Sequence, residues 1–123
     1  MGTAADAVVL VEDLFFQAKL QETAKLSGVT LATTNTGQQL LALAAANPAA
    51  LVIVDLNARH GAIEAVEQLC KTDGSGNPRR VIAFLSHVQT ELAERARAAG
   101  CEGVMPRSKF TQNLAAILRG AKL

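Results

Sequence analysis

The feature of this chain that most constrains its fold is a fivefold alternation of short apolar runs with longer segments of helical character. The apolar runs are AVVLV, VTLAT, LVIV, RVIAFL and CEGVM, at residues 7–11, 29–33, 51–54, 80–85 and 101–105. The segments with helical spacing or helix-forming composition are 13–28, 36–48, 62–71, 88–100 and 111–122. The runs are largely apolar rather than alternating, as is typical of strands covered on both faces. Strict alternation of this kind predicts a parallel sheet with right-handed crossovers and helices on both sides.

Five such units in 123 residues predict a single domain with an open, doubly wound sheet, because a closed barrel of this type needs eight units. Gly28 and Gly100 stand where helices should end, and Thr111 is a suitable N-cap for the last helix. The only aromatic residues are four Phe. The sequence therefore predicts a core of Ala, Leu, Val and Ile.

Charge and composition exclude several classes of function. The net charge of +1 does not favour bulk attraction to nucleic acid or to a membrane surface. No apolar run approaches the roughly 20 residues of a membrane span, and the first run lacks the basic start of a signal peptide, so we expect a cytoplasmic protein. Cys70 and Cys101 have no metal-site or redox-motif spacing and are expected to be reduced thiols. Without a cofactor loop or a nucleophile motif, the chain is not expected to be an enzyme.

Polar side chains follow four of the five predicted strands, where ligands bind in open sheets of this type. In chain order they are Glu12, Asp13, Asp55, Asn57, Ser86, Arg107 and Lys109. Carboxylates held close together repel each other, and a hard divalent cation such as Mg²⁺ satisfies them. Cationic side chains and a hydroxyl can hold phosphate oxygens. The group therefore predicts a phosphoryl site, with Asp55 as a candidate nucleophile.

In this order and spacing, the motifs resemble those of a response-regulator receiver domain, the phosphoacceptor module of two-component signalling. The matching segments are VVLVED, LVIVDLN, FLS, AAGCEGVMPR and LAAIL, and the resemblance extends over about residues 6–121. It implies a flavodoxin-like (βα)5 domain with strand order 2-1-3-4-5.

The resemblance also implies roles for the strand-end residues. Asp55 would accept the phosphoryl group, and the switch hydroxyl of Ser86 would bond to it. Glu12 and Asp13 would hold Mg²⁺ together with Asp55, with Asp13 a more direct ligand than Glu12, and Asn57 would supply its backbone carbonyl to the metal.

The same resemblance implies partners. The phosphoryl donor would be a histidine kinase or a phosphotransfer protein. A downstream protein would bind the face formed by the fourth helix, the fifth strand and the fifth helix, and a homodimer is compatible with the resemblance.

Several positions depart from the family pattern. Arg107 and Lys109 compete for the place of the invariant family lysine, and Arg107 is favoured because Leu114 follows it at the family spacing of seven residues. Arg59 stands where a proline is usual, and Val104 stands where an aromatic residue often rotates on activation. A further departure is His87, whose bulk after the switch hydroxyl would restrict access of a phosphoryl donor.

These departures leave two hypotheses of different class. In the first, the chain is a stand-alone receiver domain that is phosphorylated on Asp55 with the help of Mg²⁺ and changes its protein binding in response. In the second, it is a pseudo-receiver that binds a protein constitutively, because Arg107 holds Asp55 in a permanent ion pair and no phosphotransfer occurs. An independent enzyme on this fold is a third hypothesis, for which the sequence offers no cofactor loop or nucleophile motif.

Overall fold

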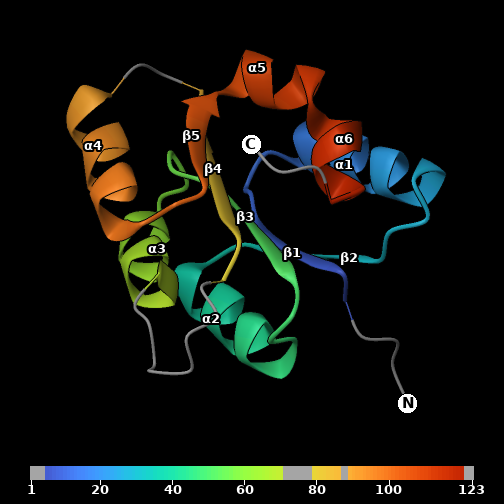
Figure 1. Ribbon diagram of the computed structural model, residues 1–123, viewed down its shortest axis with the longest axis horizontal. Coiled ribbons are helices and arrows are strands. Elements are labelled where there is room, and N and C mark those ends of the chain that lie inside the picture. Colours follow the sequence, from blue (N-terminus) through green and yellow to red (C-terminus); the bar gives the residue numbers. More distant parts are fainter. Residues whose placement is uncertain (1–4, 71–78, 87–88, 121–123) are drawn as a thin grey trace.

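The computed structural model describes residues 5–70, 79–86 and 89–120 of the chain. The expectation for His87 lies outside these residues. Within them, five parallel strands alternate with six helices (Figure 1). The strands are β1 (Ala7–Leu10), β2 (Leu31–Thr34), β3 (Leu51–Asp55), β4 (Val81–Leu85) and β5 (Gly103–Pro106). The helices are α1 (Leu14–Leu26), α2 (Gly37–Ala46), α3 (Ala62–Cys70), α4 (Thr90–Ala99), α5 (Arg107–Gln112) and α6 (Leu114–Leu118).

The strand order is β2-β1-β3-β4-β5, which confirms the predicted doubly wound arrangement. Leu10 of β1 lies beside Val54 of β3, and Asp55 lies beside Phe84 of β4. The segments that leave β1, β3 and β4 therefore start from the same edge of the sheet, which is where the site described below is found.

Each face of the sheet has its own apolar core, because successive strand side chains point to opposite faces. The first core lies under α2, α3 and α4 and is aliphatic, as predicted, and it includes the fully buried Val8, Val52 and Ala83. The second core lies under α1, α5 and α6. There the prediction of an aliphatic core is wrong, because three of the four Phe residues pack together.

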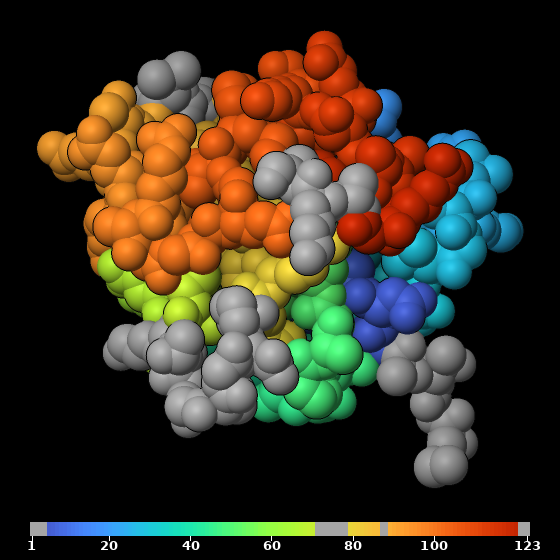
Figure 2. All heavy atoms as spheres, viewed as in Figure 1, coloured from blue at the N-terminus to red at the C-terminus, as the bar shows by residue number. Residues whose placement is uncertain are grey.

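The second core is built around a cluster of aromatic rings. The rings of Phe84 and Phe110 are stacked with centroids 4.7 Å apart, and Phe16 meets Phe84 edge-on at 5.3 Å. Sequence periodicity did not reveal this cluster because its members come from three elements that are far apart in the chain. The space-filling view shows the helices and loops covering much of the sheet (Figure 2). No helix among the described residues is both long and apolar enough to cross a membrane.

The last helical segment begins earlier than predicted. The sequence placed its N-cap at Thr111, but α5 begins at Arg107 with Pro106 in the N-cap position. The Thr111 hydroxyl instead donates to the carbonyl oxygen of Arg107, one turn back in the same helix, at 2.8 Å. Pro106 has an extended conformation with a φ of −62°, so β5 passes directly into the helix. Arg107 consequently lies in the first helical turn after the strand.

The start of α2 packs against the loop between β3 and α3 with no room for a side chain at Gly37. Its amide donates to the carbonyl oxygen of His60 at 2.7 Å, and a Cβ at this position would overlap the carbonyl oxygen of Gly61. We expect Gly37→Ala to lower the free energy of unfolding by about 1–3 kcal/mol, because backbone atoms must shift to relieve the overlap. Urea denaturation measures this change.

Gln38→Ala is the matched control, because Gln38 is exposed in the same helical turn. Its effect should stay within about 0.5 kcal/mol. Equal stability of the Gly37→Ala variant and the wild type would show that the close packing of Gly37 against the carbonyl oxygen of Gly61 does not constrain the fold.

Candidate functional site

Residues from four segments meet at the carboxyl edge of the sheet. Asp13 follows β1, Asp55 ends β3, Ser86 follows β4 and Arg107 follows β5. Hydrogen bonds join these segments directly: Arg107 donates to both Asp13 and Ser86. The structure thus brings together residues that are up to 94 positions apart in the chain, as the strand-end pattern predicted.

Asp55 is a buried carboxylate with only part of its hydrogen-bonding capacity in use. Its exposed fraction is 7%, and its Oδ1 accepts the backbone N–H of Asn57 at 2.9 Å. No described residue donates to its Oδ2. Burial raises the pKa of Asp55, while the Asn57 N–H bond and the charge of Arg107 act in the opposite direction.

Asp13 has two structural bonds and one ion pair. Its Oδ1 accepts the backbone N–H groups of Phe15 and Phe16, so it is the N-cap of α1. Its Oδ2 lies 3.1 Å from Nη2 of Arg107. The Phe16 N–H bond and the Arg107 guanidinium lower the pKa of Asp13. Both oxygens of this carboxylate are therefore already bonded to protein donors.

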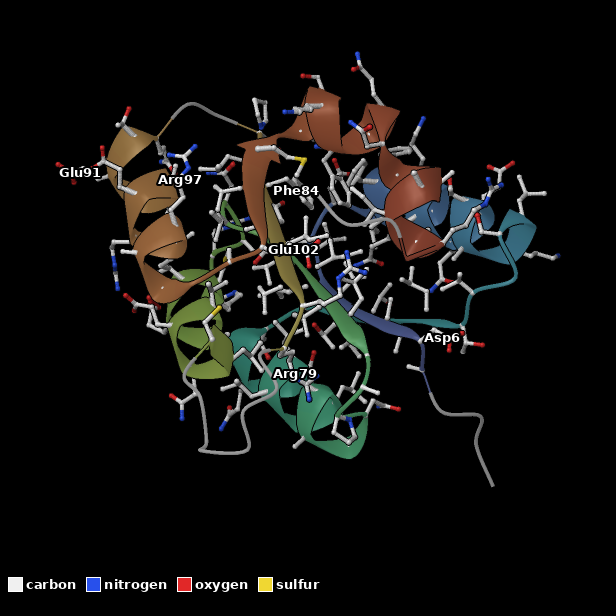
Figure 3. The ribbon with its side chains drawn as sticks, viewed as in Figure 1. Asp6, Arg79, Phe84, Glu91, Arg97 and Glu102 are labelled. Carbon is white, nitrogen blue, oxygen red and sulfur yellow. The ribbon has the colours of Figure 1, made fainter. Side chains whose placement is uncertain are left out.

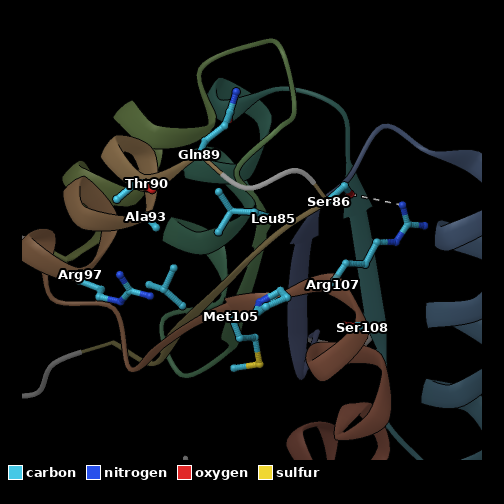
Figure 4. Close-up of a pocket in the computed structure, with 11 residues that line it drawn as sticks. Leu85, Ser86, Gln89, Thr90, Ala93, Arg97, Met105, Arg107 and Ser108 are labelled. Carbon is cyan, nitrogen blue, oxygen red and sulfur yellow. Dashed lines mark hydrogen bonds between the residues drawn. The ribbon is translucent and has the colours of Figure 1, made fainter.

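Arg107 makes three contacts with its guanidinium, which together we call the Arg107 clasp. Besides the bond to Asp13, Nη1 lies 3.4 Å from Oγ of Ser86 (Figure 4), and the guanidinium carbon lies 3.9 Å from the ring centroid of Phe16. The ion pair between Arg107 and Asp55 that the pseudo-receiver hypothesis required is not formed. The guanidinium is directed to Asp13 because it rests on the Phe16 ring, and Phe16 lies in the helix that Asp13 caps.

Lys109, the other candidate for the lysine position, lies on the exposed side of α5. Its backbone carbonyl accepts the side-chain amide of Asn113 at 2.9 Å. Among the ion pairs between described residues, none involves Lys109, so the structure brings Arg107 and not Lys109 to the acidic residues.

Glu12 is bonded to Arg59, a residue that the sequence singled out only as a departure from the family proline. The backbone N–H of Arg59 donates to Oε1 of Glu12 at 2.9 Å, and its Nε lies 3.6 Å from Oε2. The Arg59 side chain is 86% exposed, so the pair is largely solvated and weak. A cationic residue in the loop after the acceptor strand was the only sequence signal for this contact.

The side chain of Asn57 links two loops of the site. Its Oδ1 accepts the backbone N–H of Ser86 at 2.6 Å, and its Nδ2 donates to Oε1 of Gln89 at 2.8 Å. The sequence predicted a role for the backbone carbonyl of Asn57 only. It carried no signal for Gln89, which lies 32 positions away.

The residues predicted to hold Mg²⁺ have suitable donor atoms but an unsuitable arrangement. Carboxylate and carbonyl oxygens are the ligands that this cation prefers. Since Mg²⁺ needs only one or two carboxylates beside its waters, the question is whether the predicted carboxylates are open to it. Asp13 is bonded to Arg107 and Glu12 to Arg59. Magnesium binding by Glu12, Asp13, Asp55 and Asn57 stays a prediction, and this arrangement argues against it.

A pocket of about 360 Å³ lies beside the site, between α4 and β5 (Figure 4). Its walls include Leu85, Ala93 and Val104, and Arg97 and Arg107 contribute charged groups. Val104 is the residue that stands where the family often has an aromatic ring. Because valine is small, the side chain at this position does not fill the pocket.

Comparisons with known proteins agree with this topology. No protein-family model matches the sequence, and no curated protein matches it significantly. Among solved structures, the chemotaxis protein CheY4 of Vibrio cholerae superimposes with a TM-score of 0.77 at 16% identity, over 95% of this chain and 98% of that one. The receiver domain of Ssk1 from Saccharomyces cerevisiae, solved with the histidine phosphotransfer protein Ypd1, gives a TM-score of 0.75 at 14% identity, over 95% and 89%.

A third neighbour is the phosphorylated cyanobacterial phytochrome response regulator RcpA, with a TM-score of 0.66 at 20% identity, over 95% of this chain and 91% of that one. Sequence identities this low support a shared fold but say nothing about the activity of this chain. Together with the strand order, they show that this chain has the flavodoxin-like fold of response-regulator receiver domains.

Proposed function

We propose that this chain is a signalling module that accepts a phosphoryl group on Asp55 and thereby changes its binding to a protein partner. The observation that supports this most is the state of the Asp55 carboxylate. It is buried at the carboxyl edge of the sheet, and no described residue donates to its Oδ2. The charge of Arg107 lies close enough to oppose the rise that burial causes in the pKa of Asp55, but the hydrogen bonds of Arg107 go to Asp13 and Ser86. The acceptor oxygen is therefore left for reaction.

The proposed chemistry is transfer of a phosphoryl group from a phosphohistidine or an acyl phosphate. Oδ2 of Asp55 attacks phosphorus and forms an O–P bond, while the P–N or P–O bond of the donor breaks and the leaving group keeps the electron pair. Arg107 and the Ser86 hydroxyl, already adjacent, would donate hydrogen bonds to the transferred oxygens. A hydrogen bond to the transferred group would displace Ser86.

Mass spectrometry of the intact protein tests this proposal. After incubation with acetyl phosphate, both with and without Mg²⁺, we expect a fraction of the protein to gain the mass of one phosphoryl group. A protein that stays unmodified in both conditions, while a known receiver domain is phosphorylated in parallel, would contradict the proposal.

The upstream partner we propose is a histidine phosphotransfer protein or histidine kinase. One structural neighbour was solved in complex with a histidine phosphotransfer protein. In this chain, Leu14 and Phe15 follow Asp13 directly and are 74% and 91% exposed. An exposed aromatic residue beside a reactive site is a candidate contact for a protein that must approach that site.

Phe15→Ser is therefore expected to raise the KM for phosphotransfer from such a partner by about tenfold, the effect of losing a moderate interface contact. The rate of phosphorylation by acetyl phosphate should not change, because Phe15 does not contact the acceptor. Leu26→Ser is the matched control, since Leu26 is 80% exposed at the opposite end of α1. If both variants raised the KM equally, the proposed contact at Phe15 would be wrong.

The downstream partner is proposed to bind the face formed by α4, β5 and α5. The pocket between α4 and β5 opens on this face, and its apolar walls with Arg97 at the edge suit an apolar side chain next to a carboxylate. Because Ser86 also lines this pocket, a movement of Ser86 on phosphorylation would change its shape.

A second candidate function is a constitutive protein-binding module that is never phosphorylated. The observation that favours it is the ion pair between Arg107 and Asp13, which already places a positive charge at the acidic residues. In this case, binding of the downstream partner would be the same before and after treatment with acetyl phosphate.

A further inference from the structure

The acidic pair at the edge of the sheet is already bonded to cationic protein groups. Asp13 uses one oxygen to cap α1 and the other to bind Arg107. Glu12 accepts the amide of Arg59 and faces its guanidinium. A metal ion that used Asp13 as a ligand would have to displace the guanidinium or share the same carboxylate with it.

We propose that the Arg107 guanidinium is the resident cation of this site and that it suppresses binding of divalent cations there. This inference rests on the site of the proposed function, but it concerns metal affinity and not phosphorylation. The cation is part of the polypeptide chain, so the acidic edge is neutralised in the absence of any metal.

The surroundings of Arg107 hold the guanidinium in place. The guanidinium carbon lies over the Phe16 ring, 3.9 Å from its centroid, in a cation–π contact, and Phe16 is itself packed edge-on against Phe84. Its planar fork reaches Asp13 with one nitrogen and Ser86 with the other. A lysine ammonium is a single point charge and cannot make both bonds with the same geometry.

Arg107 places a positive charge 3.1 Å from Oδ2 of Asp13, and a divalent cation next to the guanidinium would be repelled. The expected consequence is a magnesium affinity that is low in the wild type and that rises when the charge at position 107 is removed.

Isothermal titration of the full chain with MgCl₂ tests this inference. We expect Arg107→Gln to bind Mg²⁺ about tenfold or more tightly than the wild type, as expected when a like charge leaves a carboxylate site. Arg107→Lys should lie between the two. Arg95→Gln is the matched control, because Arg95 pairs with Glu67 away from the site, and it should titrate like the wild type.

Amide chemical shifts give a second measurement. In Arg107→Gln, Mg²⁺ should shift the amides of Phe15, Phe16 and Asn57, which donate to the carboxylates of the site. Thermal melts show whether each variant folds. If Arg107→Gln does not fold, Arg107→Met, which also removes the charge, is titrated in its place.

The inference would be overturned if Arg107→Gln bound Mg²⁺ less than about threefold more tightly than the wild type, because the lost repulsion should exceed this factor. The absence of Mg²⁺ binding in all variants would overturn it as well. Such a result would leave phosphorylation of Asp55 untouched, since that is measured by mass. Conversely, a failure of phosphorylation would not change the expected titration.

Discussion

Replacing Phe84 with alanine is expected to lower the free energy of unfolding by about 3–5 kcal/mol, the cost of removing a fully buried aromatic ring. Phe84 (labelled in Figure 3) has no exposed surface. Its ring is stacked on that of Phe110 and meets that of Phe16 edge-on. The variant would leave a cavity in the second core. The surrounding elements come from three separate parts of the chain and cannot close over this cavity. For a domain with a typical stability of about 5–15 kcal/mol, this is a large fraction of the total.

Urea denaturation followed by circular dichroism measures the loss. Phe15→Ala is the matched control, since Phe15 is 91% exposed, and its effect should be below about 0.5 kcal/mol. A loss below about 1 kcal/mol for Phe84→Ala would mean that the aromatic cluster is not the core of this face.

Replacing Asp55 with asparagine is expected to abolish phosphorylation and, at neutral pH, to stabilise the fold by about 0.5–2 kcal/mol, the range of single stabilising substitutions. The amide cannot form an acyl phosphate. Stability should rise because burial raises the pKa of Asp55, so that the ionised carboxylate destabilises the folded state. Asparagine keeps an oxygen that can accept the Asn57 N–H.

The pH dependence of this effect has a definite sign. The folded protein protonates Asp55 at a higher pH than the unfolded chain, whose Asp has the ordinary pKa of 3.8. The wild type should therefore approach the stability of Asp55→Asn as the pH falls from neutrality through the raised pKa of Asp55. Thermal melts of the two proteins across this range measure the difference. A difference that grows on acidification would contradict the assigned pKa direction.

The sequence was sufficient to predict the architecture because the signal for it is distributed over the whole chain. Short apolar runs such as LVIV alternate with helical segments five times, and only a parallel, doubly wound sheet accommodates that pattern. The same rule placed Asp13, Asp55 and Ser86 at one edge of the sheet. Their proximity follows from topology and does not depend on any particular side-chain conformation.

The details of the site could not be predicted, because they depend on contacts between side chains that are distant in the sequence. Arg107 was expected near Asp55, and its preference for Asp13 arises from the ring of Phe16 on which it rests. The bond between Asn57 and Gln89 requires two loops to meet. The start of α5 was predicted too late because Thr111 is a good N-cap in isolation, while Pro106 starts the helix directly after β5.

These observations assign separate roles to the two charged residues that the sequence paired. Arg107 neutralises the acidic side chain that caps α1, and Asp55 keeps its carboxylate free of an ion pair with any described residue. By our proposals, the Arg107 guanidinium supplies the permanent positive charge of the site in place of a metal ion, and Asp55 accepts the phosphoryl group.

The most direct test of this account is the chemical identity of residue 55 after exposure to a phosphoryl donor. The protein is incubated with acetyl phosphate, treated with borohydride, which reduces an acyl phosphate to an alcohol, and digested for peptide mass spectrometry. We expect the peptide containing LVIVDLN to carry homoserine in place of Asp55, and the Asp55→Asn variant to be unchanged by the same treatment. An unmodified Asp55 in the wild type, or reduction at Asp13 or Glu12 instead, would contradict this account.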